Sequence, residues 1–427
     1  MNRFRKKACV ALLLFTLFIF GTMMGLRTLK PTDGFSDLAP GMELMPLMGE
    51  RLDQMDLHRT ESAGPNGVAG GDTKIVFSNS GPDHSIFYDI HIFYYLWYGS
   101  PQMDGSYVHW DHVLVPHWDS KIAASHPKGK HNPPDDIASS YFPELGAYSS
   151  RDPDVIESHM AQIEAAAAGV VVLSWYPPGV ADEHGQPSED IVPAVMDAAQ
   201  RHSIKVNDFT RLDAEMYGSH GAFYRFRSST GKVLPLFYVY DSYLTPPEAW
   251  ADLLTIRGSH SLRGTQYDGI FIALIVEERH KQDILTGGFD GMYTYFASNG
   301  FSFGSSHQNW KAIKAFCDKK NLLFVPSAGP GYTDTAIRPW NNHNSRNRVN
   351  GRYYETSLQA AMLVRPDIIT VTSFNEWHEG TQIERAVPKK TVARLYLDYK
   401  PHQPDHYLEL TRKWAEHFSK EKEQWLM

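Results

Sequence analysis

The stretch Ile90–Trp97 reads IHIFYYLW, and every residue in it except His91 is apolar or aromatic. A run of this length, followed by Tyr98 and Gly99, is typical of a β-strand that is buried on both faces. Seven further runs of the same kind follow along the chain. They are Gly169–Trp175, Ile204–Val206, Leu234–Tyr240, Gly269–Ile275, Gly291–Phe296, Leu322–Pro326 and Ile368–Phe374.

Helical patterns separate most of these runs, for example at Asp154–Ala168, Ile191–His202, Trp310–Lys319 and Tyr353–Val364. Buried strands that alternate with helices predict a parallel sheet covered by helices. Eight strands over this length favour an α/β fold of the (β/α)₈ TIM-type barrel class, as a single catalytic domain at residues 86–427. The alternative is an open doubly wound sheet, but no GxGxxG motif follows the first strand.

The N-terminus has the pattern of a membrane anchor. A basic cluster at residues 1–7 precedes an uncharged, mainly apolar stretch at residues 8–26, which is long enough to cross a bilayer as a helix. The denser positive charge before the stretch predicts a cytoplasmic tail and a type II, single-pass orientation. Residues 27–85 are rich in Gly, Pro, Asp and Ser and are expected to form a flexible luminal stem.

In a TIM-type barrel the active site lies at the C-terminal ends of the strands. In this chain, aromatic and polar residues gather at these positions and at the loops that follow, which suits the binding of sugar rings. The candidate substrate-binding residues of this kind are Trp97, Tyr98, Trp175, Tyr176, Tyr240, Asp241, Tyr293, Tyr295, Arg338, Trp340, Asn375, Trp377 and His378.

The last strand leads directly into Asn375-Glu376-Trp377-His378-Glu379. Glycoside hydrolysis usually requires two carboxyl groups, one as an acid and the other as a base or nucleophile. If the loop curls after Glu376, its carboxylate and that of Glu379 can face the same cavity, and crowding would raise one pKa. Glu376 and Glu379 are therefore the catalytic candidates, although two solvated loop glutamates would have the same spacing.

Other classes of function find less support. A formal net charge of −8 gives no indication of nucleic-acid binding. His109, Asp111, His112 and His117 could suggest a metal site, but they match no common zinc motif. We expect neither a metal nor another cofactor. Glu277 and Glu278 follow the fifth strand but more closely resemble the charged start of a helix.

Several long motifs resemble those of glycoside hydrolase family 99, the glycoprotein endo-α-1,2-mannosidases. They include FYYLWYGSPQMDGSYVHWDH, HNPPDDI, SYFPELGAYSSRDP, VLSWYPP, FYVYDSY, SAGPGY, IRPWN and SFNEWHEGTQIE. The first of these adds Tyr95 and Trp110 to the candidate substrate-binding residues. The resemblance covers Ile90 to the end of the chain, together with the short N-terminal tail and the expected anchor.

The resemblance implies a Golgi membrane enzyme that cleaves glucosylated high-mannose N-glycans internally, with retention of configuration. In the family mechanism, the glutamate that matches Glu376 acts as a base on the mannose 2-hydroxyl, which gives a 1,2-anhydro sugar. The glutamate that matches Glu379 acts as the general acid and then as the base.

The chain departs from the family pattern after its third strand. Family members continue into a His-Ile-Glu-Pro-Tyr-like segment and a helix, whereas here Val206 leads into NDFTRLDAEM at residues 207–216. The third βα unit therefore looks truncated. This leaves a second hypothesis open, in which the chain is a catalytically weak or inactive paralogue that binds glycans.

Overall fold

The computed structural model describes residues 85–174, 189–207, 218–228 and 231–426, and residues 84–427 form one compact unit. Two sheets of five strands each make up its centre. The first has the order β3 (Lys205–Asn207), β2 (Ala168–Leu173), β1 (Phe87–Tyr94), β10 (Ile369–Val371) and β9 (Ser327–Ala328). The second has the order β4 (Arg225–Arg227), β5 (Val233–Val239), β6 (Ile270–Leu274), β7 (Gly291–Tyr293) and β8 (Leu323–Val325).

Every strand pair in the two sheets is parallel except β4 with β5, so the predicted parallel arrangement is present. The sheets meet at Pro326, which lies between β8 and β9. β8 pairs with β7 in one sheet, and β9 pairs with β10 in the other. Residues 323–328 therefore correspond to a single interrupted strand, which links the two sheets as halves of a TIM-barrel-like α/β fold.

Side chains along the strands alternate between two separate cores, as a closed barrel requires. On β1, Phe93 and the following Tyr95 belong to an inner cluster, while Ile92 and Tyr94 belong to an outer one. The inner cluster draws on six strands, with residues such as Val170, Val172, Leu236, Ile272, Tyr293 and Val325. The outer cluster packs the strands against the helices.

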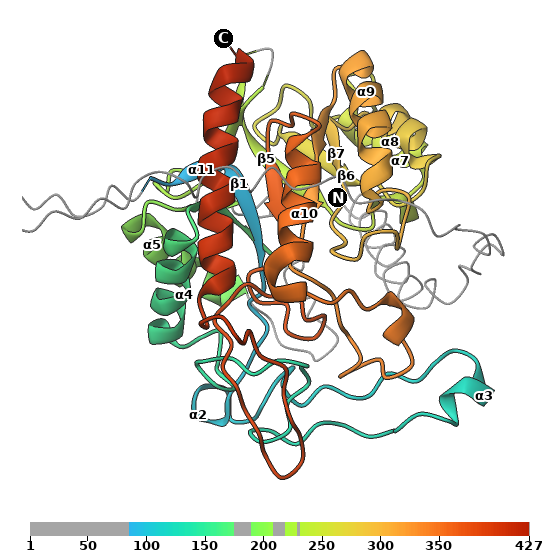
Figure 1. The fold of residues 1–427 in the computed structure, drawn as a ribbon. Coiled ribbons are helices and arrows are strands. Elements are labelled where there is room, and N and C mark those ends of the chain that lie inside the picture. Colours follow the sequence, from blue (N-terminus) through green and yellow to red (C-terminus); the bar gives the residue numbers. More distant parts are fainter. Residues whose placement is uncertain (1–84, 175–188, 208–217, 229–230, 427) are drawn as a thin grey trace, which may run out of the picture. The chain divides into compact units, whose positions relative to one another are not determined.

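Helices surround the sheets (Figure 1). α4 (Pro153–Ala165) and α5 (Val192–Arg201) lie on one side, and α7 (Pro247–Leu254), α8 (His280–Gly287) and α9 (Trp310–Lys320) lie on the other. α10 (Arg352–Met362) and the long α11 (His406–Leu426) run between these groups. Two short helices, α2 (Pro101–Asp104) and α3 (Ser120–Ala123), occur in the loops at the lower end, where the strands end.

The third βα unit departs from the regular pattern. β3 has three residues, as β7, β8 and β10 do, but its Val206 bonds to the segment Ala222–Tyr224 instead of to β5. The amide of Val206 donates to the carbonyl of Ala222 (2.7 Å), and the amide of Tyr224 donates to the carbonyl of Val206 (2.9 Å). The described residues between β3 and β5 contain no helix. Residues 208–217, where the sequence departs from the family, lie outside the described part.

The predicted anchor at residues 8–26 and the stem also lie outside the described residues. Within the described ranges, no helix is both long enough and apolar enough to cross a membrane.

Candidate active site

The loop that follows β10 curls back on itself and carries both candidate glutamates. The backbone amide of Thr381 donates to the carbonyl of Glu376 (3.3 Å), and the amide of Ser373 donates to the carbonyl of Thr381 (3.0 Å). The amide of Ile383 then donates to the carbonyls of Ser373 and Phe374, both at 3.0 Å. These bonds close residues 373–383 into a compact loop, which is the curl that the sequence interpretation required.

Glu376 is held at the base of this loop. Its backbone amide donates to Oγ of Ser373 (2.8 Å), and its carboxylate Oε1 accepts from the amide of His378 (3.0 Å). The residue is only 4% exposed. Burial raises the pKa of Glu376 well above its ordinary value, and the charge of Glu379 raises it further. The two carboxyl groups therefore interact electrostatically and titrate as a pair.

Glu379 is more accessible and is flanked by other charges. Its surroundings remove it from water and raise its pKa to about 7, an effect that Arg338 opposes and Asp334 reinforces. Asp334 is completely buried, and its Oδ2 accepts from Arg338 (3.2 Å), Tyr332 (3.0 Å) and Asn341 (2.9 Å). A carboxyl group with a pKa near 7 can donate a proton at neutral pH.

Residues next to the two glutamates in the sequence bond to other parts of the chain and hold the loop at residues 373–383 in place. The side-chain amide of Asn375 accepts from the amide of Tyr95 (2.8 Å) and donates to its carbonyl (2.9 Å), which joins the loop to the end of β1. His378 Nδ1 bonds to the carbonyl of Ala138 (2.7 Å). Trp377 is fully buried. In this structure these side chains hold the loop in place.

A buried ionic network lies behind Trp377. The carboxylate of Glu384 accepts from Trp377 Nε1 (2.9 Å) and from the hydroxyl of Tyr148 (2.8 Å). Its other oxygen lies 3.1 Å from His159 Nε2 on α4, and His159 Nδ1 bonds to the hydroxyl of Tyr94 on β1 (2.9 Å). The sequence analysis missed Glu384 and His159, which are 225 positions apart and share no motif.

The aromatic candidates on the β1 side form a continuous stack. The Trp97 ring lies 4.5 Å from that of Tyr95 and 4.6 Å from that of His109, and it is partly exposed. Tyr98 stacks on Trp110 at 4.2 Å, and both are buried. Trp97 is therefore the member of this group with most access to solvent, while Tyr98 and Trp110 form the layer beneath.

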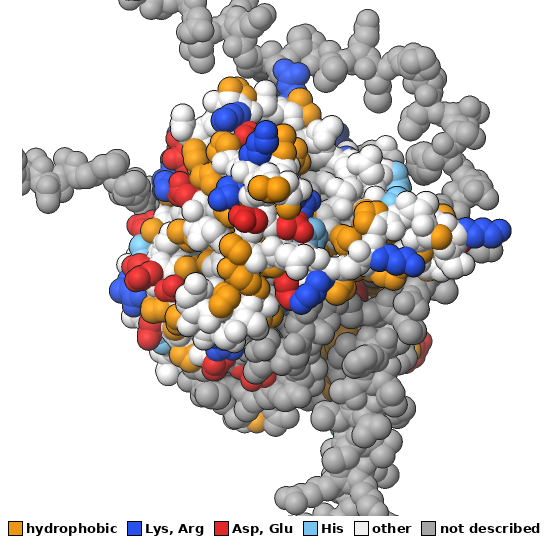
Figure 2. Space-filling view, turned by 90° about the horizontal axis from the view of Figure 1, so that it is seen from below, with side chains coloured by type: hydrophobic (Ala, Val, Ile, Leu, Met, Phe, Trp, Pro, Cys, Tyr) orange, Lys and Arg blue, Asp and Glu red, His pale blue; other side chains and the backbone are white. Residues whose placement is uncertain are grey.

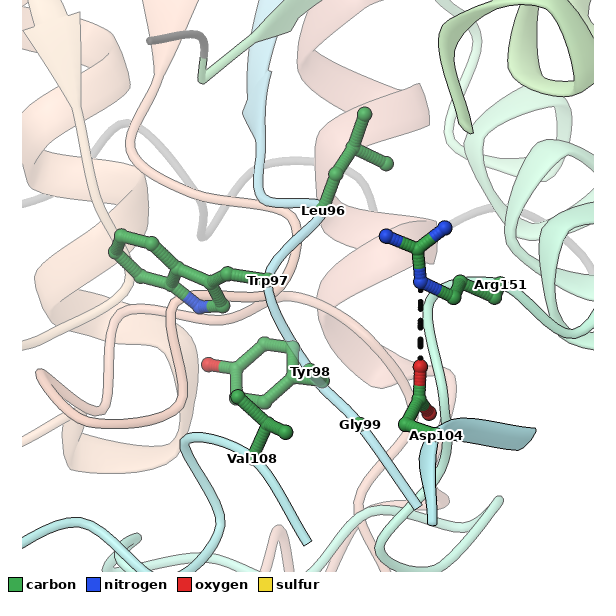
Figure 3. A pocket seen from close by; sticks show the side chains of 7 residues that line it. All are labelled: Leu96, Trp97, Tyr98, Gly99, Asp104, Val108 and Arg151. Atoms are coloured by element: carbon green, nitrogen blue, oxygen red, sulfur yellow. Dashed lines mark ion pairs between the residues drawn. The ribbon is translucent and has the colours of Figure 1, made fainter. Parts of the chain in front are cut away.

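Figure 3 shows how the segment after β1 is fixed. The indole of Trp97 lies on one side of the segment, and an ion pair between Arg151 and Asp104 lies on the other, with Nε and Oδ1 3.2 Å apart. Gly99 allows the chain to pass close to Val108, because an added Cβ would come within 2.8 Å of its side chain. These contacts set the direction in which Trp97 points.

The candidates on the second sheet lie near the same carboxyl groups. The hydroxyls of Tyr95 and Tyr295 hydrogen-bond across the top of the inner core, and the nearby charges of Glu376 and Glu379 raise the pKa of Tyr295 beyond the effect of burial. Tyr240 is half exposed and packs edge-on against Tyr295 at 5.1 Å. Asp241 accepts from Tyr243 (2.8 Å).

The remaining predicted residues fall into three groups. Tyr293 is 1% exposed and belongs to the inner core. Trp340 is partly exposed and lies in the same loop as Arg338. Trp175 and Tyr176 lie outside the described residues. The assignment of all these side chains to substrate binding stays a prediction.

The residues considered for a metal site serve other purposes. The Nδ1 of His109 lies 3.3 Å from Nε2 of His378, and His112 bonds to the carbonyl of Val113 (2.7 Å). Across the described ranges, no group of three or more His, Cys, Asp or Glu side chains is arranged to hold a metal ion. Glu277 and Glu278 pair with Arg279 and Lys281 at the start of α8.

Replacement of Glu384 by alanine should destabilise the protein strongly, because it leaves the buried His159, Tyr148 and Trp377 groups without their shared partner. The expected loss in the free energy of unfolding is about 3–5 kcal/mol. The matched control is Glu144→Ala, which removes an exposed carboxylate 3.5 Å from Arg385 and should cost less than about 1 kcal/mol. Denaturant unfolding of both variants measures the difference, and equal losses would contradict a structural role for the network.

Comparison with known proteins identifies the family. Residues 85–420 match the family model described as glycosyl hydrolase family 99. The chain is 86% identical to the zebrafish (Danio rerio) glycoprotein endo-alpha-1,2-mannosidase-like protein and 60% identical to the human one, with 100% of each chain covered in both cases. It is 51% identical to the Xenopus laevis glycoprotein endo-alpha-1,2-mannosidase, again over the full length of both.

A solved structure agrees with the sequence relatives. The GH99 endo-alpha-mannosidase from Bacteroides thetaiotaomicron superposes with a TM-score of 0.72 at 40% identity, covering 79% of this chain and 99% of that one. The likeness of the two structures agrees with a barrel-like fold. The resemblance to family 99 that the motifs indicated is confirmed. The chain belongs to glycosyl hydrolase family 99 and is a glycoside hydrolase.

Proposed function

We propose that this chain is a Golgi membrane endo-α-1,2-mannosidase that trims glucosylated high-mannose N-glycans with retention of configuration. The observation that carries the proposal is the coupled pair of Glu376 and Glu379 in one compact loop. The aromatic side chains of Trp97 and Tyr240, which retain access to solvent, lie near this pair and suit the apolar faces of pyranose rings. The chain would be anchored by residues 8–26, with its catalytic domain in the lumen.

The two glutamates differ in their surroundings, and the mechanism that the family resemblance implies gives them different roles. Glu376 is the more buried and would take the proton from the mannose 2-hydroxyl. The freed oxygen would attack C1 as the bond from C1 to the leaving glycan breaks, and Glu379 would protonate the leaving oxygen. Water would then add to C1, losing a proton to Glu379, while Glu376 returns its proton to the sugar oxygen. Each glutamate thus ends in its starting state, and configuration is retained overall.

The second hypothesis, a weak or inactive paralogue that binds glycans, rests on the short β3 unit. Val206 of β3 bonds to the segment Ala222–Tyr224, and the described residues between β3 and β5 contain no helix. The alignment with the zebrafish relative spans 442 positions, which exceeds the chain's 427 residues by 15. A shortened rim at this point would remove substrate contacts without touching Glu376 or Glu379.

Incubation of the full-length chain, in detergent, with a monoglucosylated high-mannose glycan should release a glucosyl-mannose disaccharide. Glu379→Gln should lower turnover by a factor of about 10²–10⁴, the usual contribution of a general acid. Glu278→Gln, which changes an exposed glutamate outside the loop, is the control and should retain full activity. Mass spectrometry of the released sugar is the measurement, and glycan binding without any release by the unmodified chain would favour the second hypothesis.

The pH dependence provides a separate test of the role of Glu379. Because Glu379 must be protonated to act as an acid, activity should fall as the pH rises through about 7. Arg338 lowers the pKa of Glu379, so Arg338→Met should raise that pKa and move the alkaline limb to higher pH, even if overall activity declines. Arg385→Met, which removes an exposed cation, should leave the limb in place. An unmoved limb in Arg338→Met would contradict this assignment.

A further inference from the structure

Three rings form an exposed aromatic surface that the proposed mechanism does not use, and we refer to His117, Trp118 and Trp340 as the aromatic platform. Trp118 is 53% exposed. Its ring stacks on His117 at 3.8 Å and meets Trp340 edge-on at 5.3 Å. The ring of His117 is also perpendicular to that of Trp340, at 4.8 Å. The indole of Trp118 is thus held by two neighbours while much of its surface remains in water.

His117 and Trp118 directly precede α3, on a long arm that stands out from the body at the lower end of Figure 1, whereas Trp340 lies in the loop that carries Arg338. Backbone bonds close the base of the arm, where the amide of Leu114 donates to the carbonyl of Gly129 (2.8 Å). Figure 2 views the molecule from this end, and hydrophobic side chains lie among charged ones on the described surface. The ring of Trp118 is therefore presented on a structured arm.

Hydrogen bonds join the platform to the loop that carries Arg338. The indole Nε1 of Trp340 donates to the carbonyl of Val115 (2.8 Å), and the amide of Val115 donates to the carbonyl of Ile337 (2.8 Å). Arg338 is bonded to Asp334, and its charge acts on Glu379. The exposed indole is therefore linked to the loop of Arg338 through ring contacts and hydrogen bonds, and Arg338 acts on the candidate acid through its charge.

The chemistry of the surface favours a sugar ring as its occupant. A partly exposed indole offers a flat apolar face, while the groups around it are polar and can meet hydroxyls. Asp119 accepts from the amide of Lys121 (2.8 Å) and donates its own amide to His117 Nδ1 (2.9 Å), so the turn beside the ring is ordered. A stable protein interface takes about 20–30 residues on each side, whereas one indole face matches a single sugar ring.

We propose that the aromatic platform binds a pyranose unit of the N-glycan that lies beyond the four sugars that span the cleaved bond. The inference rests on the proposed endo-mannosidase function and adds a specificity determinant to it. Trp118 would supply the stacking face, and Trp340 and His117 would hold it in position. A long glycan would then gain a contact that a short substrate cannot reach.

The test compares two substrates on the full-length chain, a short tetrasaccharide that spans the cleaved bond and a complete monoglucosylated high-mannose glycan. Trp118→Ala should raise KM for the complete glycan by up to about tenfold, in line with the loss of one aromatic contact. The kcat and KM for the tetrasaccharide should not change. The control is Tyr88→Ala, which removes an exposed aromatic ring on β1 at the opposite end of the strands.

Equal effects of Trp118→Ala on the two substrates, or no effect on either, would contradict the proposal that the aromatic platform binds a sugar. If the unmodified chain cleaves neither substrate, the proposed hydrolytic function fails, and the platform is then tested by binding. Titration of the complete glycan into the unmodified chain and Trp118→Ala should show weaker binding by the variant. Equal affinities of the unmodified chain and Trp118→Ala for the complete glycan would contradict sugar binding by the platform, whether or not the chain is catalytically active.

Discussion

The carboxylate of Glu384 is the group on which the geometry of the site depends. It is fully buried, yet it receives hydrogen bonds from Trp377 and Tyr148 and faces His159. Removing a carboxylate from water costs several kcal/mol unless good partners replace the solvent. The partners here come from the catalytic loop itself, from the segment before α4 and from α4. Because the buried carboxylate of Glu384 needs these hydrogen-bond partners, it holds three distant parts of the chain together.

This anchoring has an electrostatic consequence at the candidate catalytic pair. With Trp377 held below the loop, Glu376 stays buried and Glu379 stays beside Arg338 and Asp334. Two carboxyl groups in a site of low polarity cannot both ionise easily, so their protonation is coupled. The charge of Arg338 acts on both groups, but Glu376 is buried whereas Glu379 keeps some access from solvent, so their surroundings differ. The contacts that stabilise the loop therefore also set the surroundings that determine the protonation of Glu379.

The sequence predicts the strands well, because each is a continuous apolar run with a clear end. The run Ile90–Trp97 becomes β1 at Phe87–Tyr94, and Ile368–Phe374 becomes β10 at Ile369–Val371. The run Ile204–Val206 offers few apolar residues, and it corresponds to β3 at Lys205–Asn207. α7 was not predicted, and only its last residue, Leu254, is buried.

The candidate site could be predicted only in part. Strand ends indicate which residues are near the rim, but they do not tell which way a side chain points. Trp110 and Tyr98 stack on each other and are buried, whereas Trp97, which stacks on Tyr95 and His109, remains partly accessible. The pairing of Glu384 with His159 could not be found from spacing, because it depends on how α4 packs against the loop. Sequence patterns describe neighbours along the chain, whereas the contact between Glu384 and His159 forms only when α4 packs against the loop in the folded protein.

The most direct test is a titration of the two carboxyl groups by difference infrared spectroscopy in the unmodified chain, Glu376→Gln and Glu379→Gln. The account predicts that Glu379→Gln lowers the pKa of Glu376, because the neighbouring charge that raises it is gone. An unchanged pKa for Glu376 in that variant would show that the two carboxyl groups do not share one site, and would contradict the central claim.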